Sequence, residues 1–425
     1  METKKKGFPA AFWVCACTEI FERLAYYLGR SLILIFVTAS VATGGLGLSD
    51  TVAANMQSNL TAFSYLLPLF GAVIVDKYIG ARYTTPVGMF IAAAGYFTGG
   101  IAKSSVGVYA MIFLVSLGLA LFKNGAIIGR VITDKSQMDP AFSMRYTLVN
   151  VGAFIGTFLV GILYKDVFAK DGVLGFAPCF KMAALMMVLG GLWYIFVCWR
   201  FLGDLGKLPF KKTLTEEEKA AETKKKEETG TKQPLTTIEK KRIGAIFVAS
   251  LFSIVFWIFW YLGYMPVYFY WAENMDWVVA GYQVPSTWFD AANSMFCVIL
   301  GPVTAALWKK LAARPQGDMS LFRKTGLGIA IIGVGYLFYA AIDILRGGEK
   351  ASVLWLIVFA FLLTMGEMFF SPLGHSFISK YSPSRYLAVM MSVWGFATFI
   401  AAKSYGPVYG LLFGGKIEFK VACIG

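Results

Sequence analysis

The chain has 425 residues, of which 57% are hydrophobic and only 15% are charged. Soluble domains average about 25% charged residues, whereas apolar stretches of about 20 residues are long enough to cross a ~30 Å hydrocarbon core. Most of this chain falls into such stretches. The composition therefore excludes an ordinary soluble domain and indicates an all-α membrane protein with many spans.

The N-terminal segment is expected to be the first span rather than a cleaved signal peptide. It has a basic start followed by an apolar run, but the run contains Glu19, Glu22, Arg23 and Arg30. The apolar core of a signal peptide does not tolerate such charges. We therefore keep this segment as part of the membrane domain.

Eleven membrane spans are expected. Each is an apolar stretch between short loops that carry Gly, Pro, Asp or Lys. The expected spans are residues 11–40, 54–76, 83–103, 107–131, 142–165, 175–200, 243–271, 286–310, 323–345, 352–378 and 386–413.

A charged segment divides the spans into six and five. Residues 201–242 contain runs of Glu and Lys, which are typical of a solvated linker. We expect an N-terminal bundle over residues 1–200, a cytoplasmic linker over 201–242 and a C-terminal bundle over 243–425. Two sets of six spans around a long cytoplasmic loop form the layout of the major facilitator fold. A twelfth span is expected to be absent, by truncation or by loss, which would leave the C-terminus outside.

Lysine and arginine residues in the loops predict the orientation. With a cytoplasmic N-terminus, the short cytoplasmic segments hold 15 of these residues and the opposite loops hold 5, and the linker adds 11 on the cytoplasmic side. This bias predicts a multi-pass protein of the plasma (inner) membrane with its N-terminus in the cytoplasm. It also explains the formal net charge of +14 as a topology signal, so no nucleic-acid partner is expected.

The first span carries the densest set of ionisable side chains. A charge at mid-bilayer costs at least about 2.5 kcal/mol, so such residues are functional candidates. At 100° per residue, Glu19, Glu22, Arg23, Tyr26 and Arg30 fall within about 100° of arc on one helix face. Glu19 and Arg23, four residues apart, are expected to neutralise each other. A purely structural ion pair is the alternative, although four charges exceed what such a lock needs.

Lys123 and Glu367 are charged residues in the fourth and tenth spans. No acid lies near Lys123 in the sequence, so its expected partner is Glu19 or Glu22, and snorkelling to the cytoplasmic surface is the alternative. Glu367 lies near the centre of its span, where burial favours the neutral acid. A group that is neutral in one state and charged in another suits a proton-coupled carrier. Permanent pairing of Glu367 with a basic residue is the alternative.

Polar and aromatic side chains complete the candidate site. Asn150, in the fifth span, either binds a substrate amide or ties helices together. The aromatic residues expected at a cavity are Tyr26, Tyr27, Tyr65, Trp260, Tyr261 and Trp394, whereas the only histidine, His375, is expected at the membrane interface. The sequence has no catalytic motif, and its six cysteines show no metal-ligand spacing. Neither an enzyme nor a metal site is expected.

Five stretches resemble motifs of the proton-dependent oligopeptide transporter (POT) family of the major facilitator superfamily. Glu19–Arg30 is similar to the ExxER(F)xYY hallmark and the substrate-facing arginine that follows it, and Asp76–Arg82 is similar to the superfamily loop between spans two and three. Phe122–Asn124 resembles the fourth-span FKPN, Tyr146–Phe154 the fifth-span signature, and Thr364–Gly374 the tenth-span TLGExxxSPxG. The matches occur in order along the chain.

The resemblance implies a role for each matching residue. Proton coupling would fall to Glu19, Glu22, Arg23, Lys123 and Glu367. Substrate binding would fall to Tyr26, Arg30, Tyr65, Lys123, Asn150, Asn293 and Glu367, with Arg30 and Lys123 at the peptide carboxylate and Glu367 at its amino group. Asp76 would belong to a cytoplasmic gate.

The chain departs from the family pattern at three places. Tyr261-Leu262-Gly263 replaces the EQG-like triplet whose acid usually faces the first-span arginine. Asn124 occupies the position of the proline that usually follows the lysine, and Ser294 follows Asn293 where proline is common.

Two functions follow from these observations. The main hypothesis is a proton-coupled symporter in the lipid bilayer, which imports di- or tripeptides or a related small solute by alternating access. Protons are the coupling ion, and no other cofactor is expected. The alternative is a transport-inactive or sensor-like homologue of the same fold, which Tyr261 and the missing twelfth span motivate.

Overall fold

The computed structural model describes residues 7–133, 137–209, 235–315, 319–370, 377–378, 381–383 and 386–425. The described chain is almost entirely helical, as expected. It divides into two compact units. Unit 1 contains residues 1–47 and 67–213, and unit 2 contains residues 48–66 and 214–425. Much of the expected linker over 201–242 lies outside the described residues.

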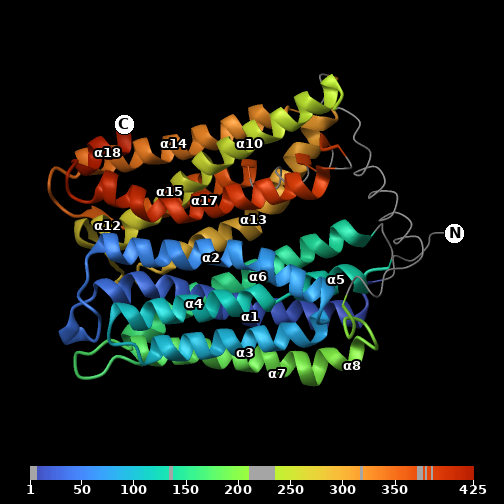
Figure 1. Cartoon of the computed structure of the whole chain (residues 1–425). Coiled ribbons are helices and arrows are strands. Elements are labelled where there is room, and N and C mark those ends of the chain that lie inside the picture. Colours follow the sequence, from blue (N-terminus) through green and yellow to red (C-terminus); the bar gives the residue numbers. More distant parts are fainter. Residues whose placement is uncertain are drawn as a thin grey trace. The chain divides into compact units, whose positions relative to one another are not determined.

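Unit 1 is a bundle of long helices (Figure 1). Its elements are α1 (Ala10–Thr38), η1 (Val41–Thr43), the second half of α2 (Asp50–Lys77), α3 (Ala81–Gly100), α4 (Ser105–Leu121), α5 (Asn124–Val131), α6 (Met138–Ile162), η3 (Leu163–Val167), α7 (Phe176–Trp193), η4 (Tyr194–Cys198) and α8 (Trp199–Phe201). Helix α1 packs along α6 and α7, and α3 packs along α4 and α7.

Two glycines let α6 lie directly against α1. A Cβ atom on Gly152 would come within 2.8 Å of the Ile20 carbonyl oxygen, and one on Gly156 would come within 2.4 Å of the Leu24 carbonyl oxygen. Larger residues therefore do not fit without movement of helix backbone, as is usual where small residues bring membrane helices together. The contact places the N-terminal part of α6 beside the acidic stripe of α1.

Unit 2 is a second helical bundle. Its elements are the first half of α2, α10 (Thr237–Leu262), α11 (Met265–Tyr268), α12 (Tyr270–Asn274), α13 (Trp288–Ala312), α14 (Leu321–Leu345), α15 (Trp355–Phe370), α17 (Leu387–Phe413) and α18 (Phe419–Ile424). Short strands connect some of them: β1 (Met275–Asp276) pairs in parallel with β4 (Ala351–Ser352), and β2 (Val278–Val279) pairs antiparallel with β3 (Tyr282–Gln283). Helix α10 packs on α17, and α15 packs on α13 and α14.

A helix is present in each of the eleven expected spans, but two spans are interrupted. The fourth span breaks between α4 and α5, where Phe122 is extended with φ −73° and ψ 102°. The seventh span breaks after Leu262, and α11 begins with Pro266 in its first turn, where the missing N–H of proline is tolerated. Periodicity alone cannot locate such breaks, because the residues on both sides are equally apolar.

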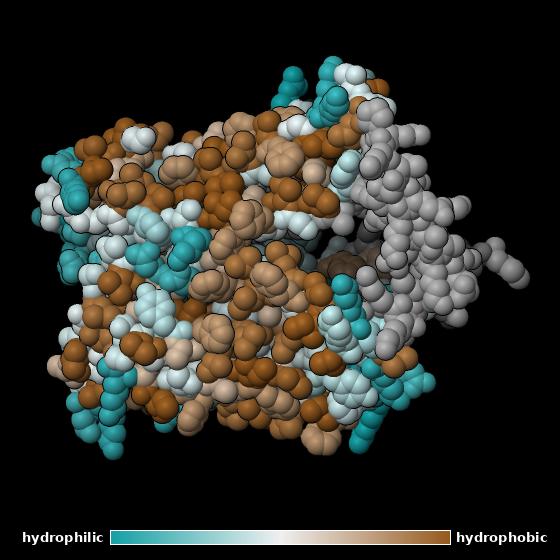
Figure 2. All heavy atoms as spheres, in the orientation of Figure 1, coloured by the Kyte–Doolittle hydropathy of each residue, from teal (hydrophilic) through white to brown (hydrophobic). Residues whose placement is uncertain are grey.

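The described helices have the length and surface of membrane spans. Seven stretches are long and apolar enough to cross a bilayer: Asp50–Val75, Ser105–Val131, Pro140–Val167, Phe176–Phe201, Thr237–Asn274, Trp288–Trp308 and Phe322–Leu345. Figure 2 shows apolar side chains covering much of the helix surface, with hydrophilic ones gathered mainly toward the helix ends. Lipid-exposed helices need this pattern because hydrocarbon offers no partners for polar groups.

Candidate functional site

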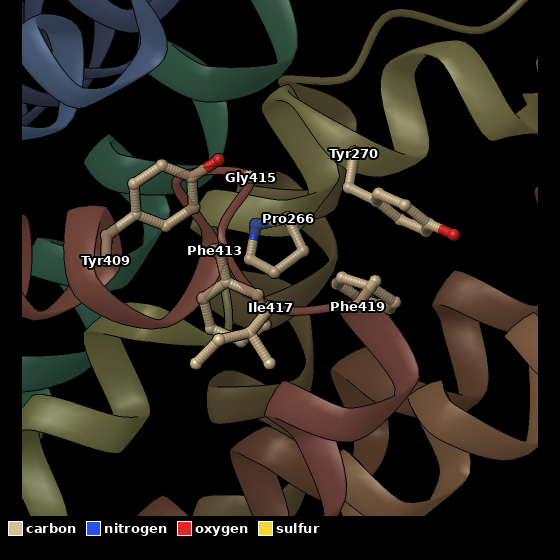
Figure 3. Close-up of a pocket in the computed structure, with 7 residues that line it drawn as sticks. All are labelled: Pro266, Tyr270, Tyr409, Phe413, Gly415, Ile417 and Phe419. Atoms are coloured by element: carbon tan, nitrogen blue, oxygen red, sulfur yellow. The ribbon is translucent and has the colours of Figure 1, made fainter.

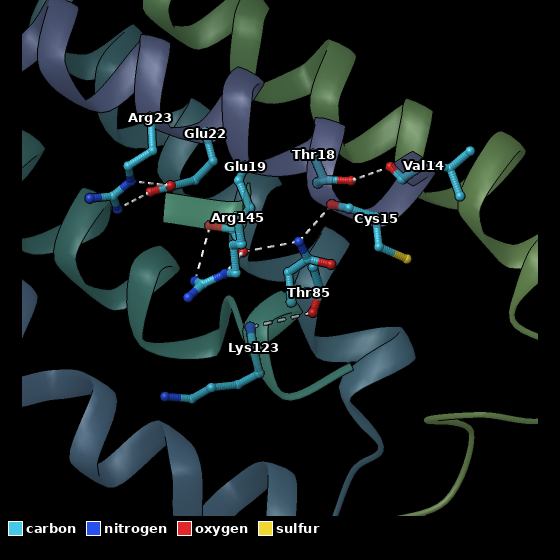
Figure 4. A network of polar contacts seen from close by, with 10 residues as sticks. Val14, Cys15, Thr18, Glu19, Glu22, Arg23, Thr85, Lys123 and Arg145 are labelled. Atoms are coloured by element: carbon cyan, nitrogen blue, oxygen red, sulfur yellow. Dashed lines mark hydrogen bonds and ion pairs between the residues drawn. The ribbon is translucent and has the colours of Figure 1, made fainter. Parts of the chain in front are cut away.

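A buried ion pair joins α1 to α6 in unit 1. The Glu19 side chain is only 2% exposed. Arg145 on α6 donates from Nε to Glu19 Oε1 at 3.0 Å and from Nη2 to Oε2 at 3.2 Å (Figure 4). A guanidinium that binds both oxygens of a carboxylate forms one of the stronger hydrogen-bonded pairs in proteins. The close packing of α1 on α6 holds the two groups in place.

Asn124, the first residue of α5, binds the same carboxylate. It is completely buried, and its Nδ2 donates to Glu19 Oε1 at 3.1 Å and to the Cys15 carbonyl at 2.8 Å. Glu19 thus receives three hydrogen bonds from two helices. Three donors on one carboxylate suit its ionised form.

Glu22 pairs with its neighbour Arg23. Glu22 is 1% exposed, and Arg23 donates to both of its oxygens at 2.5 Å. The Arg23 guanidinium also lies 4.8 Å from the centre of the Tyr26 ring, within cation–π range. The stripe on α1 is therefore real, but the expected pairing of Glu19 with Arg23 is wrong, because Arg145 and Glu22 take these two groups instead.

Lys123 lies in the break between α4 and α5. Its Nζ donates to the Pro68 carbonyl at 2.8 Å, and its backbone N–H donates to Thr85 Oγ1 at 3.4 Å. In the described structure it contacts neither Glu19 nor Glu22, which have their arginine partners. The expected ion pair of Lys123 with one of these acids is therefore not formed.

The remaining predicted residues of unit 1 lie on α1, α2 and α6. Tyr26 and Arg30 are buried on α1, at 6% and 4% exposure. Asn150 is partly buried on α6, and its Nδ2 donates to the Tyr146 carbonyl of its own helix at 3.0 Å. Asp76 belongs to α2, but its side chain lies outside the described part of the structure.

Unit 2 contains a second buried acid. Glu367 on α15 is 8% exposed and accepts from Asn293 Nδ2 of α13 at 3.3 Å. Asn293 also donates to Thr364 Oγ1 at 2.8 Å, and Cys297 Sγ lies 3.8 Å from the Glu367 carboxylate. Among the described residues, no basic side chain pairs with Glu367. The alternative of permanent pairing with a cation therefore finds no support in the described structure.

Tyrosines occupy the region where the family motif usually carries a seventh-span acid. The Tyr261 hydroxyl donates to the Tyr65 hydroxyl at 3.4 Å, and the Tyr261 ring stacks on Tyr405 at 4.8 Å between ring centres. Tyr405 contacts Gln57 at 3.2 Å and Thr61 at 3.3 Å. Tyr261 thus links α10 to α2 and α17 by hydrogen bonding and stacking, where the family motif would supply a charge.

Sequence reasoning missed three polar residues. Arg145 lies in the expected span 142–165, but no role was predicted for it. Asn124 was noted only as a departure from a motif. Lys403 was overlooked, although it is the only charged residue in the 27 residues of α17, and its Nζ donates to Asn59 Oδ1 of α2. A search for single charges inside each apolar helix would have found it.

The remaining predicted features add no further polar cluster within the described part of the chain. Ser371, Pro372 and His375 lie outside the described residues. The cavity in Figure 3, of about 150 Å³, is lined by aromatic and aliphatic groups such as Tyr409, Phe413 and Phe419. The part of the chain that the structure describes holds no group of three potential metal ligands.

The fold and these clusters define a multi-pass helical membrane protein of the major facilitator class, with buried acids in both units. Known proteins of this class share the fold along almost the whole chain. A solved POT family transporter in complex with a thioalcohol-conjugated peptide gives a TM-score of 0.84 at 22% identity, covering 98% of this chain and 93% of the other. A peptide transporter POT in complex with sulfate gives a TM-score of 0.84 at 24% identity, covering 100% and 93%.

Sequence comparisons find related transporters. A family model described as POT family matches residues 206–413. The uncharacterized transporter YclF of Bacillus subtilis is 25% identical, covering 96% of this chain and 88% of the relative, and the peptide transporter YePEPT of Yersinia enterocolitica is 24% identical, covering 94% and 86%. A di-/tripeptide transporter of Lactococcus lactis is 24% identical, covering 91% and 86%. These matches agree with the resemblance to the POT family that the sequence motifs indicated.

Proposed function

We propose that this protein is a proton-coupled symporter that imports di- or tripeptides, or a related small solute, by alternating access. The observation that carries the proposal is the set of buried acids inside the helices. Arginines hold Glu19 and Glu22, and the groups that hold Glu367 within the described part of the chain are neutral. Acids in these surroundings change charge when they bind a proton. The names of the relatives support peptides as the cargo.

Proton binding would act through the ion pairs of unit 1. A proton on Glu22 removes the negative charge that holds Arg23, and a proton on Glu19 does the same for Arg145. Each event leaves a cation in a site of low polarity, which favours a rearrangement of the helices that carry the pair. The proton therefore serves as the coupling ion, and no other cofactor is needed for this step.

The substrate roles follow the chemistry of a peptide's two ends. Arg30 and Lys123 are assigned to the peptide carboxylate, because both are cationic, and Glu367 is assigned to the amino group. Tyr26, Tyr65, Asn150 and Asn293 supply hydrogen bonds to the peptide amides, and Asp76 is assigned to the cytoplasmic gate. The loop charges support a cytoplasmic N-terminus in the plasma (inner) membrane.

The direct test is uptake of labelled dialanine into proteoliposomes under an inward proton gradient. Glu22→Gln and Glu367→Gln should each lower gradient-driven uptake by about tenfold or more, because a typical coupling free energy corresponds to a factor of this size. Glu418→Gln is the matched control, because Glu418 is an exposed acid that pairs with Lys420. Dialanine binding without any uptake by the native protein would overturn the proposal, and so would full uptake by both glutamine variants.

A further inference from the structure

Asn124 has one polar atom that its present contacts do not use. Nδ2 is occupied by Glu19 Oε1 and by the Cys15 carbonyl. Oδ1 is buried and has no hydrogen-bond partner among the described residues. A buried acceptor without a donor is costly and calls for an explanation. The explanation we infer is that Asn124 Oδ1 belongs to the same side chain that binds Glu19 through Nδ2.

The groups that face Glu19 come from three helices. Arg145 from α6 and Asn124 from α5 bind it directly, while Glu22 and Cys15 from α1 are the nearby titratable groups. Both direct partners donate hydrogen bonds, so the observed arrangement suits the ionised carboxylate. A protonated Glu19 carries an O–H group and needs an acceptor, which neither bond provides.

We propose that Asn124 is a positioning residue that serves both protonation states of Glu19; this role rests on the proton coupling proposed above and deepens it. In the ionised state, Nδ2 donates to the carboxylate. When a proton from hydronium forms an O–H bond on Glu19, the carboxylate loses its charge and Asn124 turns its amide so that Oδ1 accepts from this O–H. The Cys15 carbonyl then loses the hydrogen bond from Asn124 Nδ2, but it keeps its helical hydrogen bond from the Glu19 N–H.

Gly125 fixes the other partner of Glu19. A Cβ atom on Gly125 would lie 3.0 Å from Arg145 Nη2 and 3.1 Å from Cζ. The guanidinium therefore rests directly on the chain next to Asn124, and a larger residue at this position would displace it. Proline, which the fourth-span motif carries at position 124, has neither a side-chain donor nor an acceptor. The proposed role thus depends on a residue by which this chain departs from the motif.

The test is an infrared titration of the purified full-length protein. The C=O band of protonated Glu19 is assigned by difference from Glu19→Gln and followed against pH. Asn124→Leu removes both hydrogen bonds at similar side-chain size. The bond to the charged carboxylate is the stronger of the two, so the midpoint of protonation should rise by about one pH unit, and loss of the bond to the O–H should move the C=O band to higher frequency. Asn124→Asp should raise the midpoint further, because a second carboxylate opposes ionisation.

Thr157→Val is the matched control. Thr157 is a buried polar residue on α6 whose hydroxyl donates to the Ala153 carbonyl of its own helix, so the midpoint and the band should stay at their native values. Where Asn124→Leu does not fold, Asn124→Asp carries the same test. Native midpoint and band frequency in the Asn124 variants would overturn the role of Asn124.

The titration requires no transport, so the two proposals fail separately. A shifted midpoint in a protein without proton-driven uptake supports the role of Asn124 and overturns the proposed function. A native midpoint in the Asn124 variants, with proton-driven uptake intact in the native protein, overturns the role of Asn124 alone.

Discussion

The ion pair between Arg145 and Glu19 gives the sharpest stability prediction. Arg145→Met removes two charge-assisted hydrogen bonds from a carboxylate that is 2% exposed. Loss of one partner of a buried pair costs about 3–5 kcal/mol. The Arg145 side chain is 31% exposed and Asn124 stays on the carboxylate, so we expect a cost below this range, of about 2 kcal/mol. In a unit of this size that corresponds to a fall in apparent Tm of about 4–8 °C.

Thermal unfolding in detergent measures this loss of stability, with the exposure of the buried cysteines as the readout. Glu19→Gln should remove most of the cost, because a neutral amide does not need the cation, so the double-mutant cycle should give a coupling energy above about 1 kcal/mol. Arg145→Met with native stability at neutral pH, and no coupling to Glu19→Gln, would refute the reasoning.

Three further predictions concern packing, insertion and a helix-terminal contact. Gly156→Leu forces α6 away from the α1 backbone and should lower stability by at least about 2 kcal/mol in the same unfolding assay, whereas Gly244→Leu, at a glycine with open space around it, is the control. Lys403→Leu should favour insertion of the isolated α17 segment by about 3 kcal/mol in a glycosylation-based insertion assay, and unchanged insertion would contradict its placement in hydrocarbon. Arg82→Lys should lower stability by about 1 kcal/mol, because a lysine does not reproduce the guanidinium's hydrogen bonds to the Trp199 and Gly203 carbonyls. Native stability would argue against that contact.

The sequence was sufficient to place a helix in each of the eleven expected spans. Apolar length and helical periodicity are local properties, so the eleven spans and the single face that carries Glu19, Glu22 and Arg30 followed directly from them. The proximity of Asn293 to Glu367 fits the joint assignment of both residues to the cavity. These features depend on one helix at a time or on an ordered set of motifs.

The pairing of charges could not be predicted, because it depends on contacts between helices. Lys123 was assigned to an acid by charge alone. Arg145 binds Glu19 instead, because α6 packs on α1 through glycines. The break at Phe122 sets the direction of Lys123, and no periodicity marks it. Asn124 acquires its role only once Glu19 lies beside it.

The central claim is that peptide and proton move together, and a lumenal pH measurement tests it most directly. Liposomes that contain the protein and a trapped pH-sensitive dye receive dialanine outside, with the membrane potential clamped. The account predicts that dialanine acidifies the lumen, that Glu22→Gln and Glu367→Gln abolish this acidification, and that Glu418→Gln leaves it intact. Entry of dialanine without any acidification of the lumen would contradict the account.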